Sequence, residues 1–271
     1  MKQRIITGIL LSIFALSLIY FGGAVLGIAT MMCLSFVLSE VFRALTEAGH
    51  RPVAWPTWTA LISTVPLALH VGNAVFIPIL LTSSVLIIVC VLFRSEPKLE
   101  DALMSLLPLY AVVLPGLSIV SLALVEPLSV QRTLIGLLIC VPVVGDTFAY
   151  FCGSRIGGPK FCPAVSPNKT IAGAVAGLVG SLLVAALIRL VAGLICAPTT
   201  VLPSWIACIA LGLIGGAASQ VGDLFSSLIK RHCGIKDYSN MFPGHGGMYD
   251  RLDSILFNAL VLFSFRVIWF P

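Results

Sequence analysis

The sequence predicts an all-α polytopic integral membrane protein with about nine transmembrane helices, its N-terminus in the cytoplasm and its C-terminus outside. Of the 271 residues, 59% are hydrophobic and 10% are charged, whereas about a quarter of the residues of a soluble domain are charged. The mean hydropathy is +1.08. Apolar runs of about 17–25 residues recur along the chain, which is the length that a helix needs to cross the hydrocarbon core of a bilayer.

Turn residues and charges divide the apolar sequence into nine predicted helices. They cover residues 5–21, 23–44, 57–72, 74–93, 103–125, 133–152, 171–197, 203–229 and 254–270. The third is the weakest prediction, because it is short and contains Pro66 and His70. The first begins like a signal peptide, but no clear small-residue cleavage site follows it, so we expect an uncleaved span.

The cations indicate the orientation of these helices. A cytoplasmic N-terminus places 13 of the 16 Lys and Arg residues in segments that face the cytoplasm, as the positive-inside rule expects. The exceptions are Arg132, in an outside connection, and Arg189 and Arg266, within spans. The net charge of +5 therefore reflects topology, and we expect no nucleic-acid partner. The eight cysteines show no metal-ligand spacing.

A first polar cluster, GDTFAYFCGSRIGGPKFCPAVSPNKTIAG, covers residues 145–173. Asp146 falls inside the sixth apolar run, where a carboxylate is costly unless it has a partner or an ion. Helical spacing places Asp146, Tyr150 and Gly153 on one face. The loop after them offers Lys160, Lys169 and backbone N–H groups to an anion. The alternative is an ordinary cytoplasmic loop whose cations fix the topology.

A second cluster, KRHCGIKDYSNMFPGHGGMYDRLD, covers residues 230–253 and holds seven of the 27 charged side chains. Just before it, Asp223, Ser226, Ser227 and Lys230 form a polar stripe on the end of an apolar helix. The glycines of the loop allow its backbone to approach a ligand closely. Its carboxylates suit Mg²⁺ and its cations suit phosphate oxygens. Together they predict phosphoryl or nucleotidyl transfer onto a lipid.

The role of His245 within this cluster stays open between a general base, a group that orients a phosphate, and a helix cap. Walker, nucleophile-elbow and zinc-protease motifs are absent from the sequence.

The stretch from Ser227 to Asp253 closely resembles the signature of the phosphatidate cytidylyltransferases, also called CDP-diacylglycerol synthases. The matching parts are SLIKR, then KD four residues later, then PGHGGMYDRLD. The segments DTFAYF and SPNKT are similar to the other polar block of that family. One departure is Ala172, where the family commonly has a glutamate before the glycine. The resemblance implies the reaction of CTP with phosphatidate to give CDP-diacylglycerol and pyrophosphate, with Mg²⁺ required.

This resemblance and the chemistry of the side chains together give the expected site. The catalytic residues are expected to be Asp223, Asp250, Lys230, Arg231 and His245. Substrates are expected to contact Lys160, Ser166, Lys169, Ser227, Lys236, Asp237, Gly246, Gly247 and Arg251. Asp223 and Asp250 are expected to hold the metal, with Asp146 as a further ligand or in its outer shell.

The same expectations extend to organisation and location. Residues 1–271 form a single membrane domain, in which 1–130 are mainly scaffold and lipid-facing helices and 131–271 carry the catalytic helices and loops. CTP arrives from the cytoplasm and phosphatidate from the inner leaflet of a bacterial-type inner membrane, and a homodimer is one expected assembly. The rival predictions are a CTP-dependent polyprenol- or dolichol-type lipid kinase and a secondary transporter. The sequence gives no role for Arg189.

Overall fold

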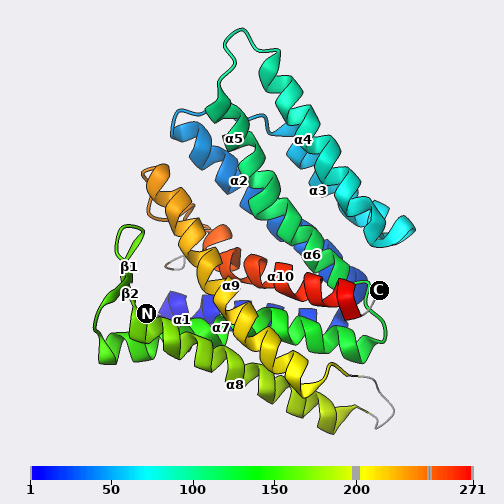
Figure 1. The fold of residues 1–271 in the computed structure, drawn as a ribbon, viewed down its shortest axis with the longest axis vertical. Coiled ribbons are helices and arrows are strands. Elements are labelled where there is room, and N and C mark those ends of the chain that lie inside the picture. Colours follow the sequence, from blue (N-terminus) through cyan, green and yellow to red (C-terminus); the bar gives the residue numbers. More distant parts are fainter. Residues whose placement is uncertain (1, 197–201, 243, 245, 270–271) are drawn as a thin grey trace. The chain divides into compact units, whose positions relative to one another are not determined.

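The computed structural model describes residues 2–196, 202–242, 244 and 246–269, with the side chains of residues 2–7, 11 and 69 outside the description. Helices dominate this part of the chain (Figure 1). Their bounds are α1 Lys2–Phe21, α2 Gly23–Glu47, α3 Trp55–Val71, η1 Gly72–Val75, α4 Phe76–Leu92, α5 Leu99–Pro108, η2 Leu109–Val113, α6 Leu114–Leu122, α7 Leu128–Ile156, α8 Ile171–Ile195, α9 Trp205–His232 and α10 Tyr249–Trp269. Each of the nine predicted segments coincides with one helix or one run of helices.

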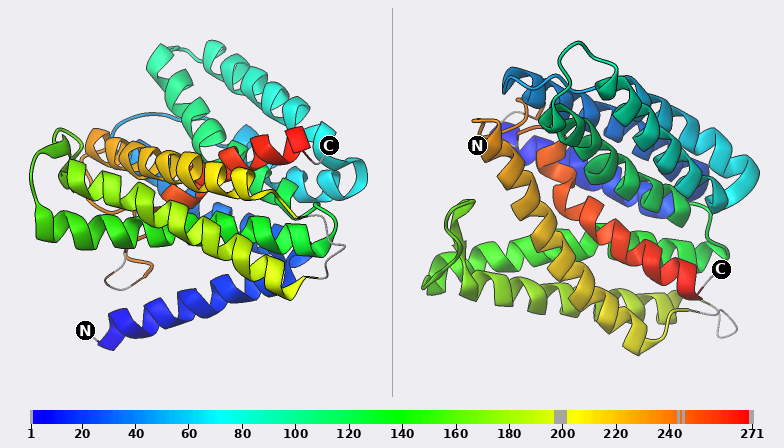
Figure 2. Two further views of the ribbon diagram at one scale, coloured as in Figure 1. Left: turned by 60° about the horizontal axis from the view of Figure 1, so that its bottom comes forward. Right: turned by 45° about the horizontal axis from the view of Figure 1, so that its top comes forward.

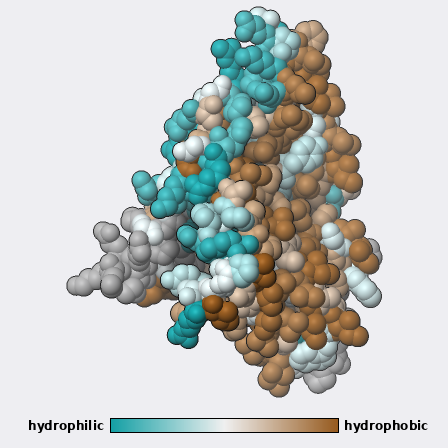
Figure 3. Space-filling model, turned by 60° about the vertical axis from the view of Figure 1, so that its left-hand side comes forward, coloured by the Kyte–Doolittle hydropathy of each residue, from teal (hydrophilic) through white to brown (hydrophobic). Residues whose placement is uncertain are grey.

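Among the described residues, seven helices or helical runs are long and apolar enough to cross a membrane. They are Gly23–Glu47, Gly72–Leu92, Leu99–Leu122, Leu128–Ile156, Ile171–Ile195, Trp205–His232 and Tyr249–Trp269. The fold is thus that of a helical multi-pass membrane protein, and the number nine stays a prediction because α3 and the apolar part of α1 are shorter. Hydrophobic side chains cover much of the surface visible in Figure 3, as expected of helices that face lipid.

A two-stranded hairpin interrupts the helices, where the sequence predicted only a loop. Strand β1 (Lys160–Cys162) pairs antiparallel with β2 (Ser166–Thr170), and the hairpin follows the end of α7 in Figure 1. It escaped prediction because its strands are short and prolines interrupt the alternation that identifies a strand. Thr170 then caps α8, since its Oγ1 accepts a hydrogen bond from the N–H of Gly173 at 3.1 Å.

The chain packs as two compact units. The first unit comprises Met1–Thr7, Gly23–Leu124 and Ile229–Arg251, and the second comprises Gly8–Gly22, Val125–Leu228 and Leu252–Pro271. The last turn of α9 and the loop after it therefore pack with α2 to α6. Packing groups residues 230–251 of the second polar cluster with helices of the N-terminal part of the sequence.

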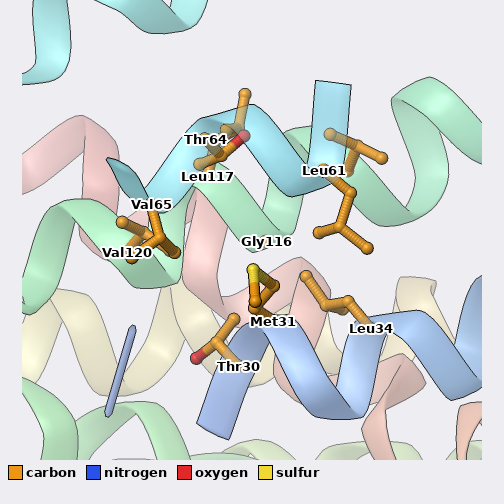
Figure 4. A pocket seen from close by; sticks show the side chains of 10 residues that line it. Thr30, Met31, Leu34, Leu61, Thr64, Val65, Gly116, Leu117 and Val120 are labelled. Atoms are coloured by element: carbon orange, nitrogen blue, oxygen red, sulfur yellow. The ribbon is translucent and has the colours of Figure 1, made fainter. Parts of the chain in front are cut away.

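In the first unit, α2 buries the side chains of Leu34, Leu38, Val41 and Leu45, which share one helical face. It lies so close to α6 that a β-carbon on Gly116 would come within 2.1 Å of Leu34 Cδ1. Side chains of α2, α3 and α6 enclose a cavity of about 10 Å³ (Figure 4). The two hydroxyl groups in its lining donate to carbonyl groups of their own helices, so the cavity is a packing void without ligand-binding chemistry.

In the second unit, α7 and α8 lie side by side in Figures 1 and 2. Glycines allow this contact. A β-carbon on Gly173 would lie 2.8 Å from the carbonyl oxygen of Ala149, and one on Gly177 would lie 3.1 Å from that of Gly145. Gly173 and Gly177 have the Gly-x-x-x-Gly spacing that lets membrane helices approach each other closely.

Pro142 sits inside α7 and has no N–H to donate to the carbonyl of Leu138, four residues earlier. The side chain of Asn258 on α10 takes over this role, because its Nδ2 donates to the carbonyl oxygens of Leu137 and Leu138 at 3.1 Å each. Ser181 of α8 donates to the carbonyl of Val141 at 3.1 Å. Side chains of two neighbouring helices thus satisfy the backbone around the proline.

Candidate active site

The most enclosed ion pair of the predicted site lies in the first unit. Lys230, near the end of α9, donates to Oδ1 of Asp250, in the first turn of α10, over 2.7 Å. Their side chains are only 12% and 4% exposed. Oδ2 of Asp250 accepts hydrogen bonds from the N–H groups of Tyr238 at 3.0 Å and Gly247 at 2.9 Å. Asp250 therefore joins Lys230 to the loop between α9 and α10, residues 233–248, which we call the signature loop.

Gly246 makes this arrangement possible. Its φ is 79°, a left-handed conformation that glycine adopts without strain. A β-carbon at this position would lie 2.9 Å from Oδ2 of Asp250. The Lys230 ammonium also lies 5.7 Å from the ring centroid of Tyr238, a cation–π contact that helps to hold the ammonium group in place.

A second ion pair lies in the second unit, where Lys169 at the end of β2 contacts Asp223 on α9. These side chains are 30% and 28% exposed, so both are open to solvent. One turn earlier on α9, Nε2 of Gln220 donates to the carbonyl of Ala174 at 2.9 Å. Asp223 and Gln220 of α9 thus face the junction of β2 and α8.

The other predicted residues of the 145–173 cluster lie on the surface of the second unit. Asp146 is exposed on α7, and Lys160 is exposed at the start of β1. Ser166, at the start of β2, is half-buried. α7 continues to Ile156, beyond the predicted end at residue 152, so Asp146 is followed by almost three further turns of helix.

Of the remaining predicted residues, Lys236 and Asp237 lie in the signature loop, and Ser227, Arg231 and Arg251 lie on the helices before and after it in the sequence. Ser227 is half-buried on α9. Four side chains are exposed: Arg231, Lys236, Asp237 and Arg251. His245 lies outside the described residues. The structure therefore brings together Lys230, Asp250, Gly246 and Gly247 in one unit, and Lys169 with Asp223 in the other.

In the described part of the chain, no three His, Cys, Asp or Glu side chains gather at one point. Mg²⁺ does not require such a cluster, because it is usually bound by one or two carboxylates together with waters and substrate phosphates. Asp223, which is partly exposed and acidic, fits that pattern. Asp250 already accepts three hydrogen bonds, and a carboxylate offers about four lone-pair positions.

Two neighbouring residues of the second cluster have structural contacts instead. His232 Nε2 lies 2.9 Å from His50 Nε2, which links the end of α9 to the connection between α2 and α3. Burial raises the pKa of the Cys233 thiol above its ordinary value.

Two residues of α2 that contact the signature loop, Glu40 and Arg43, were not among the site residues predicted from the sequence. Arg43 Nη2 donates to the carbonyl of Tyr238 at 2.6 Å. Glu40 is only 6% exposed and accepts hydrogen bonds from the loop. One signal was available, because Glu40 is the first carboxylate of the sequence and stands in an apolar helix, where a charge commonly marks function.

Arg189 now has a structural role. Its Nε donates to the carbonyl of Pro203 at 2.7 Å, and its guanidinium lies 5.2 Å from the ring centroid of Trp205. These contacts hold the start of α9 against α8.

An apolar groove of about 600 Å³, larger than the cavity of the first unit, lies between the first turns of α9 and the last turns of α10. It ends at Ile214 on α9, more than two turns before Asp223, so it is separate from the polar residues.

The model of the cytidylyltransferase family matches residues 2–269. A phosphatidate cytidylyltransferase of Brucella abortus is 32% identical over 280 residues, covering 99% of this chain and 94% of that protein. One from Synechocystis is 30% identical over 300 residues, covering 99% and 97% of the two chains. One from Bacillus subtilis is 42% identical over 112 residues, covering 41% and 39%.

Proposed function

The chain belongs to the cytidylyltransferase family, and on that basis we propose that it transfers the cytidylyl group of CTP to phosphatidate, giving CDP-diacylglycerol and pyrophosphate. The observation that carries this assignment is the match to phosphatidate cytidylyltransferases over nearly the whole length of both chains. The protein is thus a membrane-embedded nucleotidyltransferase of phospholipid synthesis. The relatives give no support to the lipid kinase or to the transporter.

The reaction needs little base catalysis. A phosphate monoester has a second pKa of about 6, so the phosphatidate phosphate is largely dianionic near neutral pH and is itself the nucleophile. Its oxygen bonds to the α-phosphorus of CTP while the bond to the bridging oxygen of the β-phosphate breaks, and pyrophosphate leaves with that electron pair. The obstacle is the mutual repulsion of two polyanions, which fixed cations reduce.

In the proposed site, the ion pairs place cations ready for these phosphates. Lys230 and Lys169 are each paired with a carboxylate, so neither ammonium is left unbalanced before the substrates bind. When the substrates bind, their phosphate oxygens replace the carboxylates as the partners of these ammonium groups. Arg231, Lys236, Arg251 and Lys160 add exposed positive charge for the triphosphate and the lipid phosphate, and Ser166, Ser227 and Asp237 are proposed to contact the substrates.

We propose Asp223 and Asp250 as the protein ligands of Mg²⁺, with Asp146 as a further ligand or in its outer shell. Their carboxylate oxygens are the donors that Mg²⁺ prefers. When bound, the ion neutralises charge on the triphosphate and polarises its phosphoryl oxygens. His245 is proposed to orient a phosphate through the glycine-rich part of the signature loop, because a dianionic nucleophile leaves little for a general base to do.

We propose that the N-terminus and the polar loops face the cytoplasm, that nine spans put the C-terminus outside, and that the protein lies in a bacterial-type inner membrane. Contacts within the first unit support this topology. Arg94 Nη1 donates to the carbonyl of Arg51 at 2.6 Å, and His50 meets His232. Three connections expected on the cytoplasmic side therefore meet at the same end of that unit. CTP would arrive from the cytoplasm and phosphatidate from the inner leaflet, in a monomer or a homodimer.

The test uses purified protein in lipid nanodiscs with phosphatidate and CTP labelled at the α-phosphate. Wild-type protein should transfer the label to the lipid and release pyrophosphate, whereas release of labelled CDP would indicate a lipid kinase. Asp223→Asn and Asp250→Asn should each lower turnover at least on the order of a hundredfold, the size of effect seen when one electrostatic contact to a transition state is removed.

The matched control is Glu96→Gln, because Glu96 is exposed in the connection before α5. It should leave turnover unchanged. Near-normal turnover of either aspartate variant across a Mg²⁺ titration would show that its carboxylate does not hold the metal.

A further inference from the structure

The signature loop is held from outside by helix α2. Arg43 binds the carbonyl of Tyr238 at one end of the loop. Next to Tyr238, the Ser239 hydroxyl donates to Glu40 Oε1, which also accepts a hydrogen bond over 2.9 Å from the N–H of Met248, at the other end of the loop. Glu40 Oε2 accepts one from the N–H of Tyr249 at 2.8 Å. A single buried carboxylate thus joins residues on both sides of the glycine-rich turn.

The N-terminus of helix α10 explains why a carboxylate is needed at the position of Glu40. The first N–H groups of a helix have no partner within the helix, and a Ser, Thr, Asp or Asn just before it usually accepts from them. Met248, the residue before α10, has no such side chain. Glu40, on a helix about 200 residues earlier, accepts instead from the N–H of Met248 and from that of Tyr249, the first residue of α10, and its negative charge is favoured at the positive end of the helix dipole.

The fit between Glu40 and the loop is close. A β-carbon on Gly247 would lie 2.6 Å from Oε1 of Glu40, so only glycine lets the backbone reach the carboxylate. A buried carboxylate is unfavourable unless it is well hydrogen-bonded. Within the described residues, three donors meet its two oxygens. Because the Glu40 carboxylate accepts these three hydrogen bonds, it holds the signature loop in one fixed position.

The same few residues lead directly to the proposed phosphate-binding lysine. Tyr238, whose carbonyl Arg43 holds, donates its N–H to Asp250. Gly247, against which Glu40 packs, also donates its N–H to Asp250, and Asp250 binds Lys230. A change at Glu40 therefore affects the position of Lys230 through the signature loop and the Asp250 carboxylate.

We propose that Glu40 is a positioning residue for cytidylyl transfer, which fixes the signature loop and the start of α10 so that Asp250 and Lys230 keep their places at the phosphates. This proposal rests on the proposed function. Glu40 touches neither substrate in this role; it acts through Ser239, Met248 and Tyr249.

Glu40→Gln is the most informative variant, because glutamine has nearly the same shape but replaces one acceptor oxygen with an NH₂ group. That group would face an N–H or O–H donor, whichever way the amide turns. We expect kcat for CDP-diacylglycerol to fall on the order of ten- to hundredfold, as for loss of a charged hydrogen bond, with KM for CTP changed far less. Ser239→Ala removes one of the three donors and should lower kcat less.

A double-mutant comparison separates positioning from general destabilisation. The effects of Glu40→Gln and Ser239→Ala on kcat should be non-additive, because both act on one contact. Hydrogen–deuterium exchange should rise in the peptide covering residues 238–250 and stay at the wild-type level in α3 and α4. Glu96→Gln, whose exposed side chain serves again as the control, should have the wild-type thermal midpoint, and Glu40→Gln should remain folded at the assay temperature.

The proposal is overturned if folded Glu40→Gln has wild-type kcat, or if its exchange rises throughout the protein. If Glu40→Gln does not fold, Ser239→Ala decides, and unchanged kcat and exchange in that variant count against the proposal. The exchange measurement uses no substrate. Absence of CDP-diacylglycerol from the wild type would therefore refute the proposed function, while the exchange data would still establish whether Glu40 fixes the loop.

Discussion

At the scale of single residues, the two lysine–carboxylate pairs differ chiefly in exposure. Lys230 and Asp250 are almost fully enclosed, whereas Lys169 and Asp223 are each close to a third exposed. A partly exposed pair typically contributes about 0–1 kcal/mol to stability, because water and salt screen it. Removal of one partner of a buried pair typically costs about 3–5 kcal/mol, because the other charge is left unpaired. The two lysines should therefore respond differently to the same substitution.

Lys169→Met should reduce activity and leave the fold intact. We expect the free energy of unfolding to change by less than about 1 kcal/mol, while turnover falls on the order of a hundredfold through loss of a phosphate contact. Thermal unfolding and CDP-diacylglycerol synthesis, measured on one preparation, check both values. A variant with normal turnover would remove Lys169 from the site.

Lys230→Met, in contrast, should lower both activity and stability. Its loss leaves the Asp250 carboxylate buried, and among the described residues its remaining partners are the backbone N–H groups of Tyr238 and Gly247. We expect a loss of about 3 kcal/mol in the free energy of unfolding. Equal stability of the two lysine variants would show that the enclosure of the Lys230 pair has no energetic consequence.

At the scale of elements, hydropathy predicted where the helices run but placed several ends too early. The predicted ends at 44, 152 and 229 compare with observed ends at Glu47, Ile156 and His232. Apolar runs measure the thickness of the bilayer, and helices continue past it through polar residues. In all three cases a glycine with φ between 66° and 92° follows the helix: Gly49, Gly157 and Gly234. Glycine in this conformation commonly ends helices, so capping residues predict the ends better than hydropathy does.

The proline in α7 provides a test of how elements support one another. Asn258→Leu should remove the donor that satisfies the Leu138 carbonyl, at a cost of about 1 kcal/mol, the size of side-chain hydrogen bonds between membrane helices. In a Pro142→Ala background the cost should be smaller, because the restored N–H of residue 142 donates to the same carbonyl.

Unfolding of the two single variants and the double variant in mixed micelles gives the coupling energy between the positions. Equal costs of Asn258→Leu in both backgrounds would show that Asn258 does not compensate for the proline.

At the scale of the whole molecule, the grouping of residues around Lys230 was predictable from the sequence, whereas the helix that supports them was not. The sequence pointed to Lys230, Asp250, Gly246 and Gly247 because charge and glycine concentrate in one stretch between apolar runs. Nothing local to that stretch identifies α2 as the helix that holds it. Glu40 and Ser239 are 199 residues apart, and hydrophobic periodicity does not show which apolar helix packs against which loop.

The proposed topology makes the final prediction, because it assigns each connection to one side of the membrane. In a variant without its native cysteines, Glu96→Cys should react with a membrane-impermeant maleimide only after permeabilisation of a bacterial host. Glu126→Cys should react in intact cells. Both side chains are exposed, so burial does not explain a difference between them. Glu96 precedes α5 and Glu126 follows α6, and the run Leu99–Leu122 between them is one of the seven candidate spans. Labelling of both positions in intact cells would refute that span, and labelling of Glu96→Cys alone would invert the orientation and place the signature loop outside, away from CTP.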